Sequence, residues 1–474
     1  MKSTTSSELK LPIDPINQHL FNLFIEFLNR APENPVFRNF DENILADKLK
    51  GKLDRKGKGS QYLYNILKEE ILIHSMNLHN PMYMGHQVPP SLPLASMLDL
   101  IISNLNQSMA VTKMSPVISL IENDLIEYLS ESIGYSENAG GTITSGGSIS
   151  NLLGIFGARK KFFKDNMPQE AVVLCSDQSH FSVAKSANVI GLSKNQVISI
   201  ETDNRYKINV DKTEEIILSL KKKGKIPFVI SANAGSTSTG SFDDINKLAH
   251  LASKYNIWLH IDGAHGCSLI YSEDLRKLLE GIEKADSISW DAHKMMFMPS
   301  SLGICLFKNV EELKNCFKEN QAPYLYNSKD ACKDLSKISI QCTRRADALK
   351  LWGSILCYGT DFFAERYEHL SKVTKYFYNK TLHHKYLEPI HEPEFNIFCF
   401  RYNPLDLKLS DNQLNDLNAE IRDLVNDNGE TMLTLTSIKG KVSLRVTIIN
   451  PATDYEHIDY LIKLIDNTFL SLHC

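Results

Sequence analysis

The chain has 474 residues, of which 43% are hydrophobic and 23% are charged. This length and composition indicate a globular protein of two or three domains, and the lack of internal repeats or low-complexity segments excludes solenoids and disordered scaffolds. The formal net charge is only −4 and both signs of charge are interspersed, so nucleic acid is not an expected partner.

The nine cysteines are scattered and never form a Cys-x-x-Cys pair. We therefore expect neither a disulfide framework nor a metal site. No segment approaches the roughly 20 apolar residues that cross a bilayer, and residues 1–10 lack the apolar stretch of a signal peptide. These features predict a soluble, unexported protein of the cytoplasm with reduced thiols and no membrane partner.

The first hundred residues carry helical patterns, interrupted by a lysine- and glycine-rich stretch that we interpret as a solvated loop over residues 48–59. The predicted helices here cover residues 21–28, 62–73 and 94–105. From about residue 140 to 310, short β-branched runs alternate with amphipathic ones. The predicted strands cover residues 171–175, 197–200, 228–232, 258–261, 287–290 and 303–307, and the predicted helices cover 181–190, 211–222 and 243–254. This alternation indicates a mostly parallel sheet with helices on both faces.

The remainder begins with a long helical pattern over residues 346–382. Strand-like runs follow at residues 395–402, 432–437 and 442–449, which is typical of a smaller α+β domain. We therefore predict an N-terminal helical segment (1–100), a large α/β domain (101–365) and a small C-terminal domain (366–474).

A glycine-rich turn, Thr-Ser-Gly-Gly-Ser at residues 144–148, precedes an amphipathic helical pattern at 149–162. Bare backbone N–H groups and the positive end of a helix dipole suit a phosphate at such a turn. The turn lacks the Gly-Lys-Ser/Thr of a Walker loop and the spacing of a dinucleotide fingerprint, which favours a phosphorylated ligand other than a nucleotide. Considered alone, the turn could also be a plain connection.

Two further side chains follow predicted strands. Asp262 ends the apolar stretch 258–261, and His180 stands just past the strand at 171–175. Open α/β sheets bind their ligands at the carboxyl ends of strands. The alternatives are an aspartate that caps the next turn and a structural histidine.

A lysine, Lys294, follows His293 near the end of the predicted strand 287–290 and precedes the apolar run 295–299. A lysine among apolar residues can act as a nucleophilic amine, although most lysines are merely solvated. The phosphate cradle, imidazole, carboxylate and amine occur in order on one α/β unit, at edges that face the same crevice. Together they indicate a single cofactor site.

These residues resemble the group II pyridoxal-5′-phosphate (PLP) dependent amino acid decarboxylases, and most of all their glutamate and cysteine-sulfinate branch. The resemblance runs from about residue 79 to the C-terminus. It is carried by segments 80–87, 145–151, 177–182 and 232–243 and by those around Asp262 and Lys294. It implies PLP as cofactor, the fold-type I (aspartate aminotransferase-like) scaffold, and a homodimer with shared active sites, with residues 1–100 at the dimer interface.

The resemblance also implies roles for residues around the cofactor. Gly147 and Ser148 bind the phosphate, and Lys294 forms the Schiff base. His180 stacks on the pyridine ring, and Asp262 pairs with the ring nitrogen.

The remaining implied cofactor contacts come from Ser236 or Thr237 beside the ring, Ala264 beneath it, and His293 next to the lysine. These positions complete the expected cofactor site.

For the amino acid substrate, the resemblance implies binding by Gln87, His265 and Arg445, the last taking a carboxylate. Tyr324, with Tyr326 as the alternative, resembles the tyrosine of the mobile catalytic loop that helps to reprotonate the product.

Two positions depart from the family pattern. The family usually has Asn-Pro-His-Lys where this chain has Asp291-Ala292-His293-Lys294. That change places a carboxylate near the phosphate. The family often has a large aromatic residue at the position of His265, so the substrate cannot be transferred from the glutamate-like branch.

The resemblance implies decarboxylation of an L-amino acid to an amine and CO₂. Gln87 and Arg445 favour an acidic substrate (glutamate, aspartate or cysteine sulfinate). The alternatives are an aromatic or diamino acid such as 2,4-diaminobutyrate, a decarboxylation-coupled aldehyde synthase, or another fold-type I carbon–carbon lyase. A non-catalytic binding subunit is disfavoured by the presence of both Asp262 and Lys294.

Overall fold

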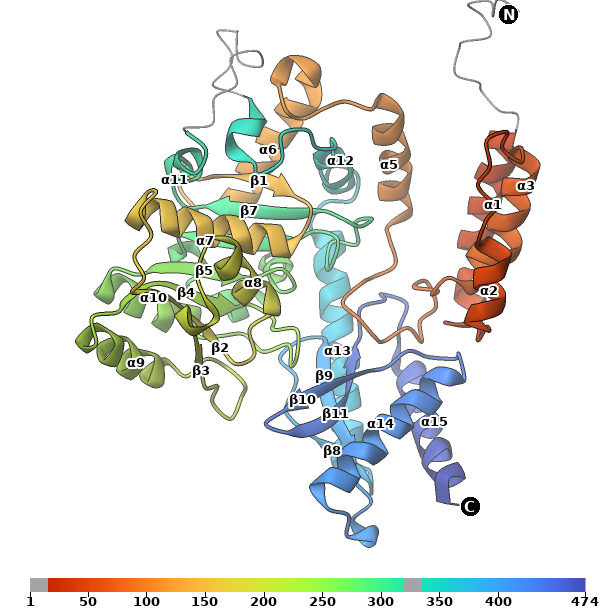
Figure 1. The fold of residues 1–474 in the computed structure, drawn as a ribbon. Coiled ribbons are helices and arrows are strands. Elements are labelled where there is room, and N and C mark those ends of the chain that lie inside the picture. Colours follow the sequence, from red (N-terminus) through yellow and green to blue (C-terminus); the bar gives the residue numbers. More distant parts are fainter. Residues whose placement is uncertain (1–15, 319–333, 474) are drawn as a thin grey trace, which may run out of the picture.

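The computed structural model describes residues 16–318 and 334–473. Figure 1 shows a large sheet layered between helices, a smaller sheet formed by the C-terminal part of the chain, and helices α1 to α3 set apart from both. The candidate site lies at the carboxyl ends of the central strands of the large sheet.

The large sheet has seven strands within the described residues, in the order β1-β7-β6-β5-β4-β2-β3. The strands are β1 (Gly140–Thr144), β2 (Ala171–Ser176), β3 (Val197–Ile200), β4 (Ile226–Asn233), β5 (Trp258–Asp262), β6 (Ser287–Asp291) and β7 (Gly303–Phe307). Neighbouring strands from β3 to β6 run parallel, whereas β7 runs antiparallel to both β6 and β1. The predicted mostly parallel sheet is therefore confirmed.

Helices cover both faces of this sheet because consecutive strand residues point to opposite sides. Val173 and Val229 pack in one apolar cluster, whereas their neighbours Leu174 and Ile230 pack in another. The first cluster includes side chains of α7 (Gly147–Phe163), α8 (Phe181–Val189) and α11 (Val310–Asn315); the second includes those of α6 (Pro116–Ile133), α9 (Val210–Lys222) and α10 (Ile245–Tyr255). Burial on both faces explains why the strands are continuously apolar.

The small sheet is antiparallel, in the order β10-β11-β9-β8. Its strands are β8 (Leu387–Pro389), β9 (Ile397–Tyr402), β10 (Thr434–Ile438) and β11 (Lys441–Thr447), and its helices are α14 (Asp411–Asp427) and α15 (Tyr455–His473). Phe377, from the preceding long helix, packs edge-on against Phe398 and Phe400 of β9, with ring centroids 5.3 and 5.0 Å away.

The prediction of one long helix over residues 346–382 was wrong. The structure has two helices, α12 (Ala348–Tyr358) and α13 (Asp361–His383), separated at Gly359, whose φ is +70°. A left-handed residue ends a helix. The strands β1 and β8 had no predicted counterpart, because β1 begins with two glycines of low strand propensity and β8 is only three residues long.

The N-terminal part is helical, as predicted. Its elements are α1 (Ile16–Arg30), α2 (Glu42–Leu49), α3 (Ser60–Ile66), a π-helical turn (Leu67–Ile71), α4 (Leu72–His74) and α5 (Pro93–Leu105). Between α4 and α5 the chain lies against the small sheet, where Met84 N–H donates to Met432 O (3.3 Å) and Thr447 N–H donates to Met84 O (2.8 Å). This pairing brings residues 80–88 to the edge of the functional site. Across the described ranges we find no helix whose length and apolar character would let it cross a membrane.

Candidate active site

A cavity of about 420 Å³ lies at the carboxyl ends of β4, β5 and β6, beside the N-terminus of α7. It brings together most of the predicted site residues. Those that line it are Gln87, Gly147, Ser148, His180, Ser236, Thr237, Asp262, Ala264, His265, His293 and Lys294. Arg445 on β11 lies directly behind Thr237, to whose carbonyl its Nη1 donates at 2.6 Å. Tyr324 and Tyr326 lie outside the described residues.

The phosphate cradle is the first turn of α7. Gly146 has a φ of +131°, which favours glycine, and a Cβ on Gly147 would lie only 2.9 Å from Asp291 Oδ2 and 3.0 Å from Ala264 Cβ. Glycine thus lets the backbone face the cavity directly. Since the first N–H groups of a helix have no intrahelical acceptor, this turn offers donors and a positive dipole end to an anion.

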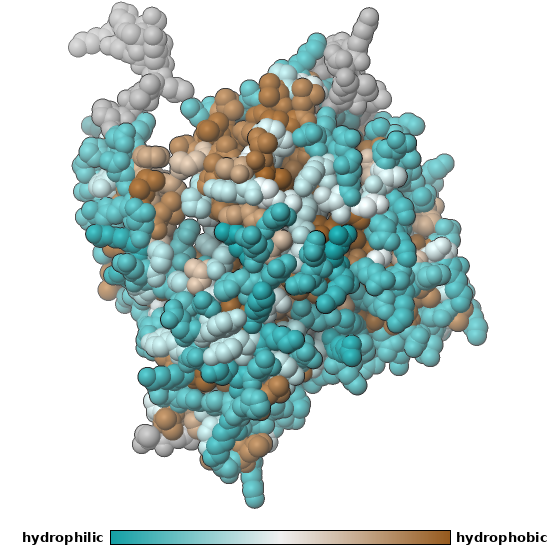
Figure 2. Space-filling model, turned by 180° about the vertical axis from the view of Figure 1, so that it is seen from behind, coloured by the Kyte–Doolittle hydropathy of each residue, from teal (hydrophilic) through white to brown (hydrophobic). Residues whose placement is uncertain are grey.

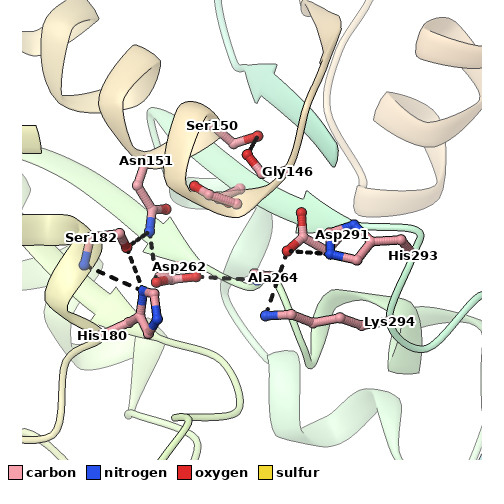
Figure 3. A network of polar contacts seen from close by, with 12 residues as sticks. Gly146, Ser150, Asn151, His180, Ser182, Asp262, Ala264, Asp291, His293 and Lys294 are labelled. Atoms are coloured by element: carbon pink, nitrogen blue, oxygen red, sulfur yellow. Dashed lines mark hydrogen bonds and ion pairs between the residues drawn. The ribbon is translucent and has the colours of Figure 1, made fainter. Parts of the chain in front are cut away.

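Asp262 is one of two aspartates that line the cavity, with Asp291, and is 8% exposed. Its Oδ2 accepts a hydrogen bond from Asn151 Nδ2 at 2.8 Å, and its Oδ1 accepts one from Ala264 N–H at 3.3 Å (Figure 3). Asp262 therefore caps the turn that follows β5 and also presents a charge to the cavity. The two interpretations of Asp262 from the sequence, a cap of the next turn and a ligand-binding group, are therefore compatible.

A buried chain of hydrogen bonds extends behind Asp262. Trp258 Nε1–H can only donate, and it donates to Ser287 Oγ at 2.8 Å. The Ser287 hydroxyl then donates to His260 Nδ1 (2.8 Å), so His260 carries its proton on Nε2 and donates it to Asn151 Oδ1 (2.9 Å). Burial lowers the pKa of His260 to about 4, which keeps this imidazole neutral.

The same chain determines the tautomer of His180. Because its amide oxygen is occupied, Asn151 turns its Nδ2 towards Asp262 and also donates to Ser182 Oγ at 2.8 Å. The Ser182 hydroxyl is therefore free to donate to His180 Nδ1 at 2.7 Å. The His180 proton then lies on Nε2. Burial is also the main cause that lowers the pKa of His180, with Lys294 contributing and Asp262 opposing.

Lys294 projects into the cavity from the turn after β6 (Figure 3). Its Nζ is 3.5 Å from Asp291 Oδ2, and the same oxygen is 3.7 Å from His293 Nε2. Asp291 itself is 3% exposed, and burial raises the pKa of its carboxyl while Lys294 and His293 oppose the rise. The departure from the family pattern at this position thus places a carboxyl in the cavity wall.

The chemistry of this cavity fits a phosphorylated, planar, aldehyde-bearing cofactor. It contains an amine, a carboxylate, an imidazole and a helix N-terminus facing one space. Three of its buried polar atoms have no hydrogen-bond partner in the described structure: Gln87 Nε2, His265 Nδ1 and Asp291 Oδ1. Unpaired buried polar atoms are costly in a protein interior, so these atoms indicate a polar ligand. Ser236, by contrast, already shares its hydroxyl with Thr239 and Ser241.

The sequence analysis assigned no role to Asn151 or His260. The position of each residue in the sequence could nevertheless have indicated one. Asn151 stands four residues after Gly147, on the same face of α7, and His260 is an imidazole inside an otherwise apolar strand. Their hydrogen bonds, however, join residues 109 and 111 positions apart.

Comparison with known proteins identifies the family. The model of the pyridoxal-dependent decarboxylase conserved domain matches residues 60–403. The chain belongs to this family. It is therefore a PLP-dependent carboxy-lyase that acts on an amino acid, as the sequence predicted.

Similar curated proteins differ in their substrates. The chain is 30% identical to an aromatic-L-amino-acid decarboxylase of Bacillus atrophaeus (95% of each chain covered) and 30% identical to an L-2,4-diaminobutyrate decarboxylase of Acinetobacter baumannii (87% of this chain, 84% of the other). It is also 30% identical to an acidic amino acid decarboxylase of Bos taurus (84% and 79%). All three relatives are amino acid decarboxylases, and they act on three different classes of amino acid.

The fold also matches that of solved structures. Mouse CSAD superposes with a TM-score of 0.90 at 24% identity, over 96% of this chain and 99% of that one. The predicted fold-type I architecture is confirmed. The likeness to the bovine protein also supports the predicted resemblance to the glutamate and cysteine-sulfinate branch.

We expect Asn151→Ala to weaken cofactor binding, because it removes one hydrogen-bond partner from each of Asp262 Oδ2, Ser182 Oγ and His260 Nε2. An unpaired buried group costs roughly 1–3 kcal/mol, which corresponds to about 5- to 160-fold in affinity. Absorbance titration of the apoenzyme with PLP measures the change. Asn188→Ala is the matched control, since this exposed amide donates only to Leu192 O. Equal affinity of Asn151→Ala and the unaltered enzyme would contradict the positioning role.

Proposed function

We propose that this enzyme decarboxylates an acidic L-amino acid to the corresponding amine and CO₂. The observation that supports an acidic substrate most directly is the environment of Arg445. Its side chain is buried and lies beside the cavity through its bond to Thr237 O. The neighbours that affect its charge are Cys399 and Tyr83, and neither is a carboxylate.

A buried cation without an anion is unfavourable, and burial accordingly lowers the pKa of Arg445. Its Nε has no partner among the described residues. A substrate carboxylate would supply both the missing charge and the missing acceptors, and the planar guanidinium suits bidentate binding.

Gln87 adds a second donor to this side of the cavity. It is buried, and its Nε2 has no hydrogen-bond partner in the described structure. The hydrogen bonds of Met84 to Met432 and Thr447 hold its segment against the small sheet, close to Arg445. An amide N–H and a guanidinium together form a receptor for a side-chain carboxylate.

The other residues have roles towards the cofactor. PLP, when bound, supplies an electron sink for the electron pair released as CO₂ leaves. Gly147 and Ser148 would hold its phosphate, and Lys294 would hold it covalently. Asp262, oriented by Asn151, would keep a proton on the ring nitrogen.

His180 and Ala264 would contact the two faces of the cofactor ring. Ser236 or Thr237 would lie beside the ring, and His293 would lie next to Lys294. His180 stays neutral and fixed by Ser182, so that its flat ring can lie against the cofactor. Reprotonation of the product is proposed for Tyr324, with Tyr326 as the alternative, from the family resemblance alone.

A diamino acid is the second candidate, because of His265. Asn396 Nδ2 donates to Ile448 O (3.0 Å), so Asn396 Oδ1 accepts from His265 Nε2–H (2.8 Å). His265 Nδ1 is therefore a bare acceptor, and it has no partner in the described structure. Burial lowers the pKa of His265 to about 3, with Lys294 and Arg445 contributing. A neutral acceptor suits a substrate side chain that donates, such as an ammonium group.

We also propose a homodimer with shared active sites. Large apolar side chains are exposed on neighbouring helices, including Leu100 on α5, Leu120 on α6 and Leu356 on α12. Figure 2 shows hydrophobic residues gathered on this side of the molecule. An exposed apolar surface of this kind is typical of an interface, and helices α1 to α3 stand apart, where a second copy can contact them.

A cytoplasmic location is proposed as well. All cysteines of the described residues are free thiols, which fits a reducing compartment.

The assignment of Lys294 is tested by Lys294→Ala. Removal of the amine abolishes covalent attachment, so we expect the purified variant to lack the absorbance near the edge of the visible range that PLP gives when joined to a lysine. CO₂ release should be lost as well. Retention of turnover with any amino acid would refute the assignment.

The acidic substrate is tested by a screen of all proteinogenic amino acids, cysteine sulfinate and 2,4-diaminobutyrate for CO₂ release, repeated with Arg445→Lys. We expect an acidic amino acid to react best. The variant should lose roughly 10- to 150-fold in kcat/KM for that substrate, since a charge-assisted bond contributes about 1.5–3 kcal/mol.

The same variant should lose little with a neutral amino acid. Arg422→Lys, on the outer helix α14, is the control. An equal loss for acidic and neutral substrates would show that Arg445 holds the α-carboxylate that all substrates share, and preferred turnover of 2,4-diaminobutyrate would favour the second candidate.

The dimer is tested by sedimentation velocity. We expect the unaltered protein to sediment as a dimer at micromolar concentration and Leu356→Asp to shift it towards the monomer, because a charge would be buried in the interface. Leu405→Asp is the matched control: both leucines are 69% exposed, but Leu405 lies beside the small sheet. A monomeric unaltered protein would reject the proposal.

A further inference from the structure

The last residue of β6, Asp291, is a carboxyl group in an unusual place. It is buried at 3% exposure, its Oδ2 lies near Lys294 Nζ and His293 Nε2, and its Oδ1 has no hydrogen-bond partner in the described structure. Lys294 and His293 therefore do not satisfy the whole group. One oxygen remains available to a ligand.

The carboxyl group faces the turn that begins α7. A Cβ on Gly147 would lie 2.9 Å from Asp291 Oδ2, and one on Gly146 would lie 4.0 Å from Asp291 Oδ1. The backbone N–H of Asp291 donates to Ala264 O at 3.2 Å, which holds the end of the strand in place. Any anion bound by the first turn of α7 would therefore lie next to this carboxyl group.

Charged and titratable groups face Asp291 from several elements. Lys294 and His293, on the turn that follows β6, stabilise the carboxylate form, whereas Asp262, at the end of β5, destabilises it. His180, before α8, and Cys267, after β5, also interact electrostatically with Asp291. The N-terminus of α7 adds backbone dipoles but no charged side chain at Gly146 or Gly147. Burial is the largest influence and raises the pKa of Asp291. A second negative charge in this cradle would raise it further, because like charges disfavour ionisation.

We propose that Asp291 contacts the phosphate of the cofactor as a neutral carboxyl group, so that cofactor binding takes up one proton from solvent. The proton lies between an Asp291 oxygen and a phosphate oxygen and replaces a repulsion by a hydrogen bond. Asp291 is thereby a cofactor-binding residue. The inference depends on the phosphate position proposed at Gly147 and Ser148, and it is independent of the substrate.

Proton uptake has a definite sign. Between the pKa that Asp291 has in the free enzyme and the higher pKa that it has beside the phosphate, each pH unit lowers the affinity by up to tenfold, because a proton must be acquired on binding. The phosphate itself is a dianion above about pH 6. A comparison between pH 7 and pH 9 therefore reports on the protein group.

The test uses 4′-deoxypyridoxine 5′-phosphate, which lacks the aldehyde and so cannot react with Lys294. Its affinity for the full-length apoenzyme is measured from pH 7 to pH 9 by calorimetry, in two non-phosphate buffers of different ionisation enthalpy. The buffer dependence of the heat counts the protons taken up. The ligand's own titrations are the same for every protein variant and cancel in the comparison.

The decisive variant is Asp291→Asn, which has nearly the same shape and whose amide can donate without acquiring a proton. We expect the ratio of the unaltered enzyme's Kd to that of the variant to rise from pH 7 to pH 9, by at most tenfold per pH unit. The unaltered enzyme should take up more protons than the variant at pH 8, by at most one. Asp286→Asn is the matched control, since Asp286 is a half-buried aspartate with a raised pKa that precedes the opposite end of β6 and accepts from Leu259 N–H.

The control variant should retain the proton uptake of the unaltered enzyme. Binding without proton uptake by the unaltered enzyme overturns the role of Asp291, whether or not Asp291→Asn folds. A shared pH dependence of the unaltered enzyme and Asp291→Asn overturns it equally. Failure of the ligand to bind at all instead overturns the phosphate position on which the inference depends.

Discussion

The site depends on a buried carboxyl group whose oxygens must find hydrogen-bond donors inside the protein. Two N–H donors, from Asn151 and Ala264, replace for Asp262 the water that burial removes. Asn151 can donate only while its amide oxygen is occupied, and His260 occupies it. The orientation of the Asp262 carboxyl group therefore depends on a chain of hydrogen bonds that reaches Trp258 on β5.

The same network joins the two roles that the family assigns to different side chains. Asn151 donates both to Asp262 and, through Ser182, towards His180. The pairing partner of the ring nitrogen and the imidazole against the ring are thus held by one amide. Because burial keeps both His180 and His260 neutral, the order of donors and acceptors stays fixed around neutral pH.

The two departures from the family pattern lie on different sides of the cavity and affect different chemistry. Asp291 lies beside the first turn of α7 and Lys294, where we propose that the phosphate binds. His265 lies on the side of Arg445 and replaces a large aromatic ring by a small acceptor. The relatives that act on aromatic, diamino and acidic amino acids are each 30% identical to this chain, so overall identity does not rank these substrate classes.

The sequence by itself determined the family, the alternation of strands and helices in the large sheet, and the strand-end positions of Asp262, His180 and Lys294, because these follow from local patterns of burial and from contiguous motifs. Only the tertiary structure decided which distant groups meet. The break at Gly359 depends on a left-handed backbone that the helical pattern conceals. The pairing of Asn151 with His260, and the placing of Gln87 and Arg445 beside one cavity, depend on packing between segments far apart in the chain, for which no local pattern exists.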